Sequence, residues 1–334
     1  MPESTVMVIQ SPHQYADIKS HADLDPFDPQ RLVSHRSDEH LALLHQDTLV
    51  ARCSLWWKDT PKSPHGAVGL IGHYAAVNDV AARSLLEAAA ERLSQCGCLR
   101  ALAPVDQNTW RDYRMIVSAS DHPPFLFEPY PGRPSSQPFT AAGFQPVAWY
   151  FSAMIDQHLS TQTARVVRAR ARMQQLGIQV RTICLDNLSR QLEQLHAVAT
   201  NAFRSNPWYV PMSDEDFSKI YGDLATQLPL DFALIAEHNH KIVGFCFAVP
   251  DMLQPLRGET ADTLIVKTLA VAPDRRYRGL GQVLLEEVHH RAFAAGMKRA
   301  IHALVREDAG LQSISRRYGR PFRRYALFGR ELSS

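Results

Sequence analysis

The segment 269–281, LAVAPDRRYRGLG, constrains the fold of this chain more than any other stretch. An apolar, extended run ends at Val271, a proline follows, and Gly279 and Gly281 lead into a helix expected over 282–295. Glycines at these places let backbone N–H groups converge on one point, and a helix N-terminus adds unpaired donors and partial positive charge. The sequence therefore predicts a strand, a pyrophosphate-binding loop and a helix, in that order.

The spacing of these glycines excludes two common phosphate-binding motifs. A dinucleotide-binding fold requires Gly-x-Gly-x-x-Gly and an acidic residue about 20 positions later. A P-loop requires Lys-Ser/Thr after its last glycine. Here the pattern is Arg276-x-x-Gly279-x-Gly281 followed by Gln282, which fits neither motif.

Residues 263–281 resemble the coenzyme A-binding motif of the GNAT (GCN5-related) N-acetyltransferase superfamily, in which Arg/Gln-x-x-Gly-x-Gly/Ala follows a strand ending in Ala-Val. The resemblance covers about residues 177–334, because the later segments follow the superfamily's order. These segments are the helix, Gly296, a strand over Arg299–Leu304, a helix over Ala309–Tyr318 and a strand near Tyr325. The resemblance implies an α/β fold with a mixed, mostly antiparallel sheet flanked by helices.

The resemblance also implies an activity, the transfer of an acetyl or other acyl group from coenzyme A to an amine by direct attack in a ternary complex. Acetyl-CoA is then the co-substrate, no metal is expected, and a backbone N–H near Leu269 would polarise the thioester carbonyl. The implied cofactor-binding groups are the backbone of Leu269, Ala270 and Val271 along the pantetheine arm, the amides of Arg276, Tyr277, Arg278, Gly279, Leu280 and Gly281 at the pyrophosphate, and Asp308 in place of an asparagine that touches the arm.

The group that accepts a proton from the attacking amine is not evident from the motif. Many superfamily members carry a carboxylate one residue before the position of Leu269, but Thr268 stands there and cannot act as a base. Lys267 is adjacent, although a regular strand would turn it to the opposite face. His302 is a candidate because an ordinary histidine pKa of roughly 6.5 suits base catalysis; a hydrogen-bonded structural histidine is the alternative.

The general acid is equally open. Relatives carry a tyrosine four residues before a glycine, and counting back from Gly319 reaches Ser315 in this chain. Tyr318 and Tyr325 lie nearby and could replace it, or either could be a core aromatic residue. The candidate catalytic residues are therefore Thr268, His302, Ser315 and Tyr318.

The two halves of the chain align with each other at a fixed offset of 199 positions. The matching residues are Leu85-Leu86-Glu87 with Leu284-Leu285-Glu286, Arg92 with Arg291, Gly97 with Gly296, and Arg100-Ala101 with Arg299-Ala300. The pattern predicts a tandem-GNAT arrangement, with a degenerate domain over 1–156, a linker helix over 157–176 and an acyl-CoA-binding domain over 177–334. The segment 76–82 reaches its helix about four residues sooner and lacks glycine, so coenzyme A is expected only in the second half.

Composition narrows the choice of partners. The 334 residues carry a formal net charge of +2, which does not favour nucleic acid or an acidic membrane as the main partner. No stretch approaches the roughly 18 apolar residues of a membrane span, and no signal peptide is recognised at the start. Five scattered cysteines favour reduced thiols and a cytoplasmic location. The oligomeric state stays open.

The acceptor is predicted to be a small-molecule amine. Aromatic residues and prolines within 205–212, together with 245–255, are expected to form its pocket, and the loop 121–138 could close over it. A protein lysine or N-terminus is an alternative acceptor that needs an open groove. A protein that binds or senses coenzyme A without transfer is the alternative function, motivated by Thr268 and Ser315, and a nucleic-acid-associated protein is a weaker third.

Overall fold

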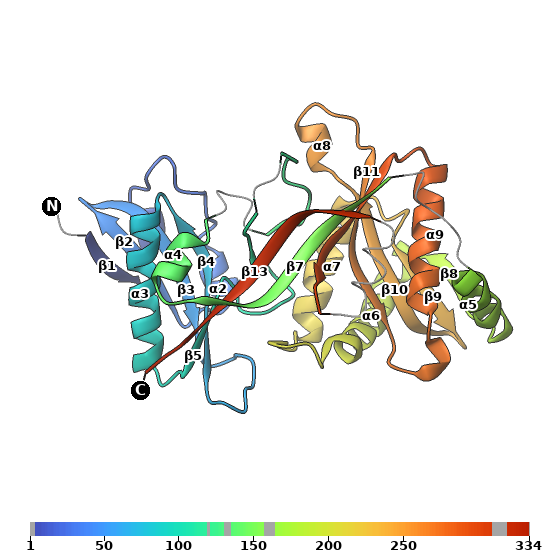
Figure 1. The fold of residues 1–334 in the computed structure, drawn as a ribbon, viewed down its shortest axis with the longest axis horizontal. Helices are drawn as coiled ribbons and strands as arrows, with labels where there is room; N and C mark the ends of the chain where they lie inside the picture. Colours follow the sequence, from blue (N-terminus) through green and yellow to red (C-terminus); the bar gives the residue numbers. More distant parts are fainter. Residues whose placement is uncertain (1–3, 119–120, 130–134, 157–163, 309–318, 334) are drawn as a thin grey trace.

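The computed structural model describes residues 4–118, 121–129, 135–156, 164–308 and 319–333. Within these residues, thirteen strands form one sheet in the order β1-β2-β3-β4-β5-β13-β7-β12-β11-β10-β9-β8, with β6 paired to β13 (Figure 1). Two neighbouring pairs are parallel, β4 with β5 and β11 with β12. The remaining pairs are antiparallel. The expected mixed, mostly antiparallel α/β fold is confirmed.

The first half of the chain contributes a sheet with α3 packed against it. Its strands are β1 (Ser4–Ile9), β2 (Glu39–His45), β3 (Thr48–Trp56), β4 (Val68–Ala76), β5 (Arg100–Ala103), β6 (Met115–Ile116) and β7 (Gln145–Asp156), and its helices are α1 (Pro12–Ala16), α2 (Arg31–Ser34), α3 (Asp79–Gln95) and α4 (Gln137–Ala141). The side chain of Asn78 caps α3 by accepting a hydrogen bond from the Ala81 amide at 2.9 Å. Leu85, Leu86 and Leu93 are buried, as the helical spacing predicts.

The second half repeats this order. Its strands are β8 (Gln179–Thr182), β9 (Leu234–His238), β10 (Lys241–Pro250), β11 (Thr263–Val271), β12 (Arg299–Arg306) and β13 (Arg320–Glu331), and its helices are α5 (Ala164–Gln175), α6 (Leu188–Phe203), α7 (Asp214–Gln227), α8 (Leu253–Leu256) and α9 (Leu280–Ala294), with short 3-10 turns η2 (Leu185–Asn187) and η3 (Arg275–Tyr277). Ser213 caps α7 by accepting from the Asp216 amide at 3.1 Å, and three acidic residues occupy its first turn.

The last strand of each half crosses into the other half. β7 pairs with β12 of the second half, whereas β13 pairs with β5 of the first half and with β7. Figure 1 shows the green β7 and the red β13 side by side between the two halves, with the C-terminus beside α3. Two separate sheets are expected from the sequence, and this exchange joins them into one. The domain boundaries at 156 and 177 stay a prediction.

A buried cluster at the junction fixes the exchange. Tyr325 and Leu327 of β13 are buried there with Leu102 of the first half and Ile265 and Ile301 of the second. Burial of large apolar side chains on both sides stabilises the junction by roughly 1.5–3 kcal/mol for each side chain. The two halves therefore share one hydrophobic core at their border, in addition to a core of their own.

Helix α5 occupies most of the predicted linker and packs on α9. Val166 and Met173 are buried in the core of the second half. Arg170 forms an ion pair with Glu287 at 3.0 Å, and Arg172 donates a hydrogen bond to the carbonyl of Arg278. Arg170 is partly buried, whereas Arg172 stays exposed while its hydrogen bond ties α5 to the start of α9.

Among the residues that the structure describes, no helix is both long and apolar enough to cross a lipid bilayer.

Candidate active site

The two parallel strands of the second half separate partway along their length. β11 and β12 pair from Thr263 with Arg299 to Val266 with His302, and beyond this point β11 has no partner on that side. At the same place β11 carries a β-bulge, because Phe247 pairs with Thr268 and Ala248 with Val266. Lys267 is the extra residue. Bulges of this kind disturb the ladder and re-aim side chains next to functional sites.

A cavity of about 560 Å³ opens where the strands separate. Both halves of the chain line it. The lining residues are Thr109, Trp110, Tyr113, Arg114 and Tyr150 from the first half, Ala202, Phe203, Asn206, Pro207, Tyr209 and Tyr221 from the region of α6 and α7, Val266 to Val271 of β11, Leu285 of α9, and His302 to Arg306 of β12. Of the predicted wall within 205–212, Asn206, Pro207 and Tyr209 line the cavity, whereas Trp208 and the segment 245–255 are not among the described lining residues. The contribution of residues 109–114 has no sequence signal.

The glycine loop, residues 272–281, has the expected geometry at its helix end. Gly279 is the N-cap of α9 with a φ of +93°. That left-handed conformation favours glycine. A side chain at this position would also lie 3.1 Å from the Cβ of Ala169 on α5. Gly279 is therefore required both by its backbone and by the close approach of α5.

The amides of the glycine loop divide into two groups. The amides of Arg276, Tyr277 and Arg278 already donate within the loop, to Asp274 Oδ1, the Asp274 carbonyl and the Arg275 carbonyl. Among the described residues, the amides of Gly279, Leu280 and Gly281 have no acceptor. The predicted pyrophosphate site narrows to these last three amides, which fit an anion at the N-terminus of α9.

The predicted contacts of the pantetheine arm lie along one wall of the cavity. Leu269, Ala270 and Val271 line it, and β10 pairs with these residues on their other edge. Backbone groups on the open edge of β11 are therefore available to an extended ligand, as the resemblance implies. Asp308 is exposed and forms an ion pair with Arg306, which itself lines the cavity.

Lys267 is the ionisable side chain that sequence reasoning set aside. The bulge removes the alternation of a regular strand, so that Lys267 and Thr268 both line the cavity. Burial and the charge of Arg114 together lower the pKa of Lys267 to about 8, against an opposing effect of Asp112. The Lys267 Nζ lies 5.6 Å from the ring centre of Phe127, which belongs to the predicted loop 121–138.

His302 has surroundings that suit packing better than base catalysis. It is 2% exposed, and its Nε2 lies 3.0 Å from Nε2 of His289 on α9. Burial and the neighbouring His289 lower the pKa of His302 well below its ordinary value. A weak base held against a second ring accepts a proton poorly, although its role stays a prediction.

The candidates for the general acid are mostly outside the described part of the chain. Ser315 and Tyr318 lie outside the described residues, as does the predicted helix 309–318. Tyr325 is buried at the junction, where its hydroxyl donates to Glu128 and lies 3.0 Å from Ser152 Oγ. Burial raises the pKa of Tyr325, and its side chain forms part of the core.

In the first half, β4 and β5 also separate partway along their length, but the protein's own residues fill the space between them. Val68 pairs with Arg100 as Thr263 pairs with Arg299, so the strands are offset by 195 positions and their partners by 199. The four missing residues are those of the glycine loop, as predicted. A side chain on Gly72 would collide with the backbone of Val105, which shows how closely the chain has closed the gap.

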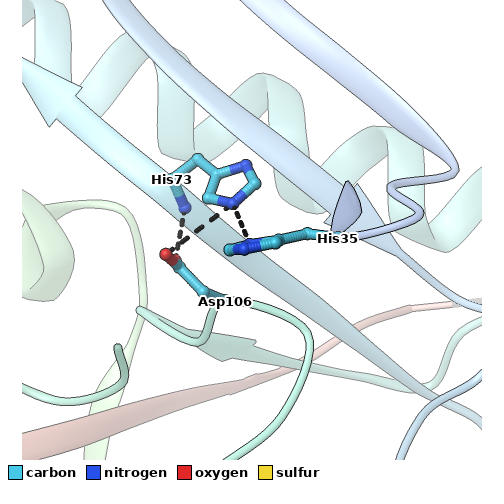
Figure 2. Close-up of side chains that lie close together, drawn as sticks. All are labelled: His35, His73 and Asp106. Carbon is cyan, nitrogen blue, oxygen red and sulfur yellow. Dashed lines mark hydrogen bonds and ion pairs between the residues drawn. The ribbon is translucent and has the colours of Figure 1, made fainter. Parts of the chain in front are cut away.

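A buried polar chain occupies the position that corresponds to Thr268 in the first half. His73 stands there, and its amide donates to Asp106 Oδ1 at 2.6 Å. Figure 2 shows its ring between Asp106 and His35, whose Nδ1 lies 2.8 Å from His73 Nε2. Ser54 Oγ bridges His73 Nδ1 and His40 Nδ1 at 2.8 and 2.7 Å. β4 also has a register shift here, between the pairs Arg52–Ala75 and Ser54–Gly72, and Asp106 satisfies the His73 N–H at this irregularity.

This group offers the donor set of a metal site. One ligand atom each of His35, His73 and Asp106 lie within 4.8 Å of one another. Burial and nearby arginines lower the pKa of His35 to about 2 and that of His73 to about 3, so both rings are neutral. The positive charges of Arg31 and Arg111, which cause part of these shifts, also oppose a bound cation. The expectation that no metal binds stays a prediction.

A comparison of the sequence with protein families agrees with this geometry. Residues 193–315 match the family model described as the acetyltransferase (GNAT) family. Residues 193–315 form a GNAT domain. The match includes the glycine loop, the separated strands β11 and β12, and α6 and α7 above the cavity. No curated protein matches the sequence.

Solved structures show that the fold extends over both halves. A probable N-acyltransferase from Enterococcus faecalis aligns with 99% of this chain and 73% of its own at 9% identity and a TM-score of 0.58. A tandem GNAT protein from the clavulanic acid biosynthesis pathway aligns over 99% of both chains at 11% identity and a TM-score of 0.51. A fungal multi-domain GH3 beta-N-acetylglucosaminidase with a GCN5-related glucosamine N-acetyltransferase region aligns with 98% of this chain at 12% identity and a TM-score of 0.56, and this chain spans 38% of it.

Proposed function

We propose that this protein is an acetyl-CoA-dependent N-acetyltransferase that modifies the amine of a small molecule. One observation supports this above the others. The three unpaired amides of Gly279 to Gly281 lie at the start of α9, and the open edge of β11 runs from there into a cavity walled by both halves. An anion site, an extended edge and an acceptor cavity thus follow one another along the same strand and helix.

In this proposal, acetyl-CoA supplies the acyl carbon and a thiol leaving group. The amine nitrogen forms a bond to that carbon while the carbon–sulfur bond breaks. Before it can attack, an alkylammonium must lose a proton. Lys267 lines the cavity beside Thr268 and is partly neutral near neutrality because its pKa is lowered to about 8. We assign the proton-accepting role to the Lys267 amine.

A small acceptor suits the walls of the cavity. Trp110 of the first half contacts Phe203 and Tyr209 of the second half edge-to-face, with ring centres 5.9 and 6.1 Å apart. These rings close the acceptor side with residues from both halves. A protein substrate would need an open groove in their place.

A coenzyme A-binding protein without transferase activity is the second candidate. Thr268 stands in the slot where relatives carry a carboxylate, and Ser315 in the slot of the usual tyrosine. Turnover separates the two functions. Amine-dependent release of the free thiol of coenzyme A supports transfer, whereas saturable binding without release for any amine would support the second candidate.

The test of the cofactor site uses two glycines with the same backbone conformation. Gly279 and Gly296 both have a φ of +93°, at opposite ends of α9. Alanine costs about 1–2 kcal/mol of backbone strain at either position. Only Gly279→Ala also pushes against Ala169 at the anion site. We expect Gly279→Ala to weaken acetyl-CoA binding by at least about tenfold in calorimetry, while Gly296→Ala lowers the melting temperature and retains binding. Equal affinities of the two variants would contradict the assignment.

A further inference from the structure

The charges on the wall of the cavity have one sign. Arg114, Lys267 and Arg306 line it, and none of the described lining residues is an aspartate or a glutamate. Arg306 pairs with Asp308. Among the described residues, neither Arg114 nor Lys267 has a carboxylate within ion-pair distance, although the Asp112 carboxyl acts on both from outside the lining. A cavity of this kind repels a polycation and attracts an anion.

Arg114 is held rigidly in this wall. It is 5% exposed, and its guanidinium carbon lies 3.9 Å from the ring centre of Tyr113 and 4.3 Å from that of Tyr150. Its Nη1 donates to Tyr113 Oη at 2.6 Å, while its Nε is buried without an acceptor. The Tyr113 and Tyr150 rings are nearly perpendicular, with an interplanar angle of 89°, so Arg114 is confined by two rings without being sandwiched between parallel planes. A buried cation without an anion is costly, so the arrangement favours an anionic ligand.

Two more buried polar atoms on the same wall lack partners. They are Trp110 Nε1 and Tyr209 Oη, whose rings are in edge contact. An indole N–H is a donor only, so it requires an acceptor atom. Besides the cations of the wall, the Asp112 carboxyl acts on this region, and burial together with Asp106 raises its pKa. Among the described residues, the buried N–H groups of Trp110 and Arg114 on this wall therefore lack an acceptor.

We infer that the acceptor is an amine that also carries a carboxylate, and that Arg114 binds this carboxylate while the amine points to Lys267 and Thr268. The inference rests on the proposed function and names the substrate class of the same cavity. The Arg114 guanidinium is confined by the Tyr113 and Tyr150 rings, it uses one donor on Tyr113 Oη, and its remaining N–H donors suit the oxygens of a carboxylate. The inference also assigns a role in substrate binding to the first half, because Arg114 belongs to that half.

The test compares matched acceptors. For each amine, the free amino acid, its carboxamide and the decarboxylated amine are assayed by thiol release from acetyl-CoA, with a polyamine and an O-phosphorylated amine as further arms. We expect the carboxylates to have the highest kcat/KM, by about 10- to 100-fold over the carboxamides. A preference for the phosphorylated amine, equal rates for acids and amides, or a preference for the polyamine would each overturn the inference.

The variants test whether Arg114 is the source of the preference. Arg114→Gln should remove the advantage of acids over amides through a higher KM, and Arg114→Lys should retain part of it. Arg324 is the matched control, because it stacks on Trp149 at 3.8 Å outside the cavity and pairs with Glu307 at 2.7 Å. Arg324→Gln should keep the ratio of acid to amide. A ratio unchanged in Arg114→Gln would refute the assignment, and Arg114→Lys answers the same question if that variant does not fold.

A binding measurement separates failure of the inference from failure of the proposed function. The melting temperature is recorded with coenzyme A and each acid or amide. If no amine releases thiol but acids still raise the melting temperature through Arg114, the transferase proposal fails and the carboxylate site stands. If amines are acetylated without regard to the carboxylate, the transferase proposal stands and the inference fails. If neither effect is seen, both fail.

Discussion

At the scale of single residues, the chemistry of the cavity depends on how burial changes the protonation of its cationic side chains. Lys267 and Arg114 are both cations in the same wall, yet they respond differently. Burial lowers the pKa of Lys267 to about 8, whereas a guanidinium stays charged under any condition of interest. The two residues therefore have different roles: Lys267 can exchange a proton, whereas Arg114 can only bind an anion.

The pH dependence of the reaction tests the role of Lys267. A neutral amine is the active form, so kcat/KM should rise about tenfold per pH unit below pH 8 and level off above it. Lys267→Met should lower kcat by about 100-fold or more and remove this rise. An acceptor amine of low pKa keeps the substrate's own titration out of this range.

Exposed Lys241 on β10 supplies the control, because Lys241→Met should retain both the rate and the profile. A second readout has a defined sign. The pKa of Lys267 is lower in the folded than in the unfolded chain, so the wild-type free energy of unfolding should increase from about pH 8 toward pH 10, and Lys267→Met should lack this increase. An unchanged pH–rate profile in Lys267→Met would assign the proton to another group.

At the scale of elements, α5 is more than a connection between the halves. It places Ala169 against Gly279 and Arg172 on the carbonyl of Arg278. A positive charge thus lies beside the amides that we assign to the pyrophosphate.

Substitution on α5 measures this contribution. We expect Arg172→Gln to weaken coenzyme A binding by about two- to tenfold at low salt and by less at high salt, since an exposed cation is screened. Arg168 is exposed on the same helix and has no hydrogen bond or ion pair shown in the described structure, so Arg168→Gln is the matched control. Calorimetric titration at two salt concentrations gives both values. A salt-independent loss, or an equal loss in both variants, would show that Arg172 acts only through the fold.

Features formed by neighbouring residues could be predicted from the sequence, whereas features that depend on distant residues could not. The glycine loop and α9 follow from neighbouring residues, because a strand, Gly279 and a capped helix are local features. The position of Lys267 depends on a bulge opposite Phe247, and that of Arg114 on a loop from the other half, so neither has a local signature. The exchange of β7 and β13 is also non-local, since a strand's own sequence does not name its partner.

At the scale of the whole molecule, the two halves share a strand topology, but they differ in what lies between their separated parallel strands. In the second half the separated strands leave a cavity, whereas in the first half Val105 closes on Gly72 and Asp106 takes the amide of His73. We regard the first half as a diverged copy that lost its cofactor loop. Through Arg114 and Trp110 it now forms one wall of the other half's cavity.

This division predicts one acetyl-CoA per chain. The first half lacks the residues that leave free amides before α9, and its Asn78 side chain already caps the corresponding helix. Calorimetric titration should therefore give a stoichiometry of one, and Gly279→Ala should weaken this one site by at least about tenfold without revealing a second site. A stoichiometry of two would mean that the first half opens between β4 and β5, with the Asp106 carboxylate leaving the His73 amide. Since a buried amide left without an acceptor costs about 1–3 kcal/mol, such an opening should occur only if the ligand itself replaces that hydrogen bond.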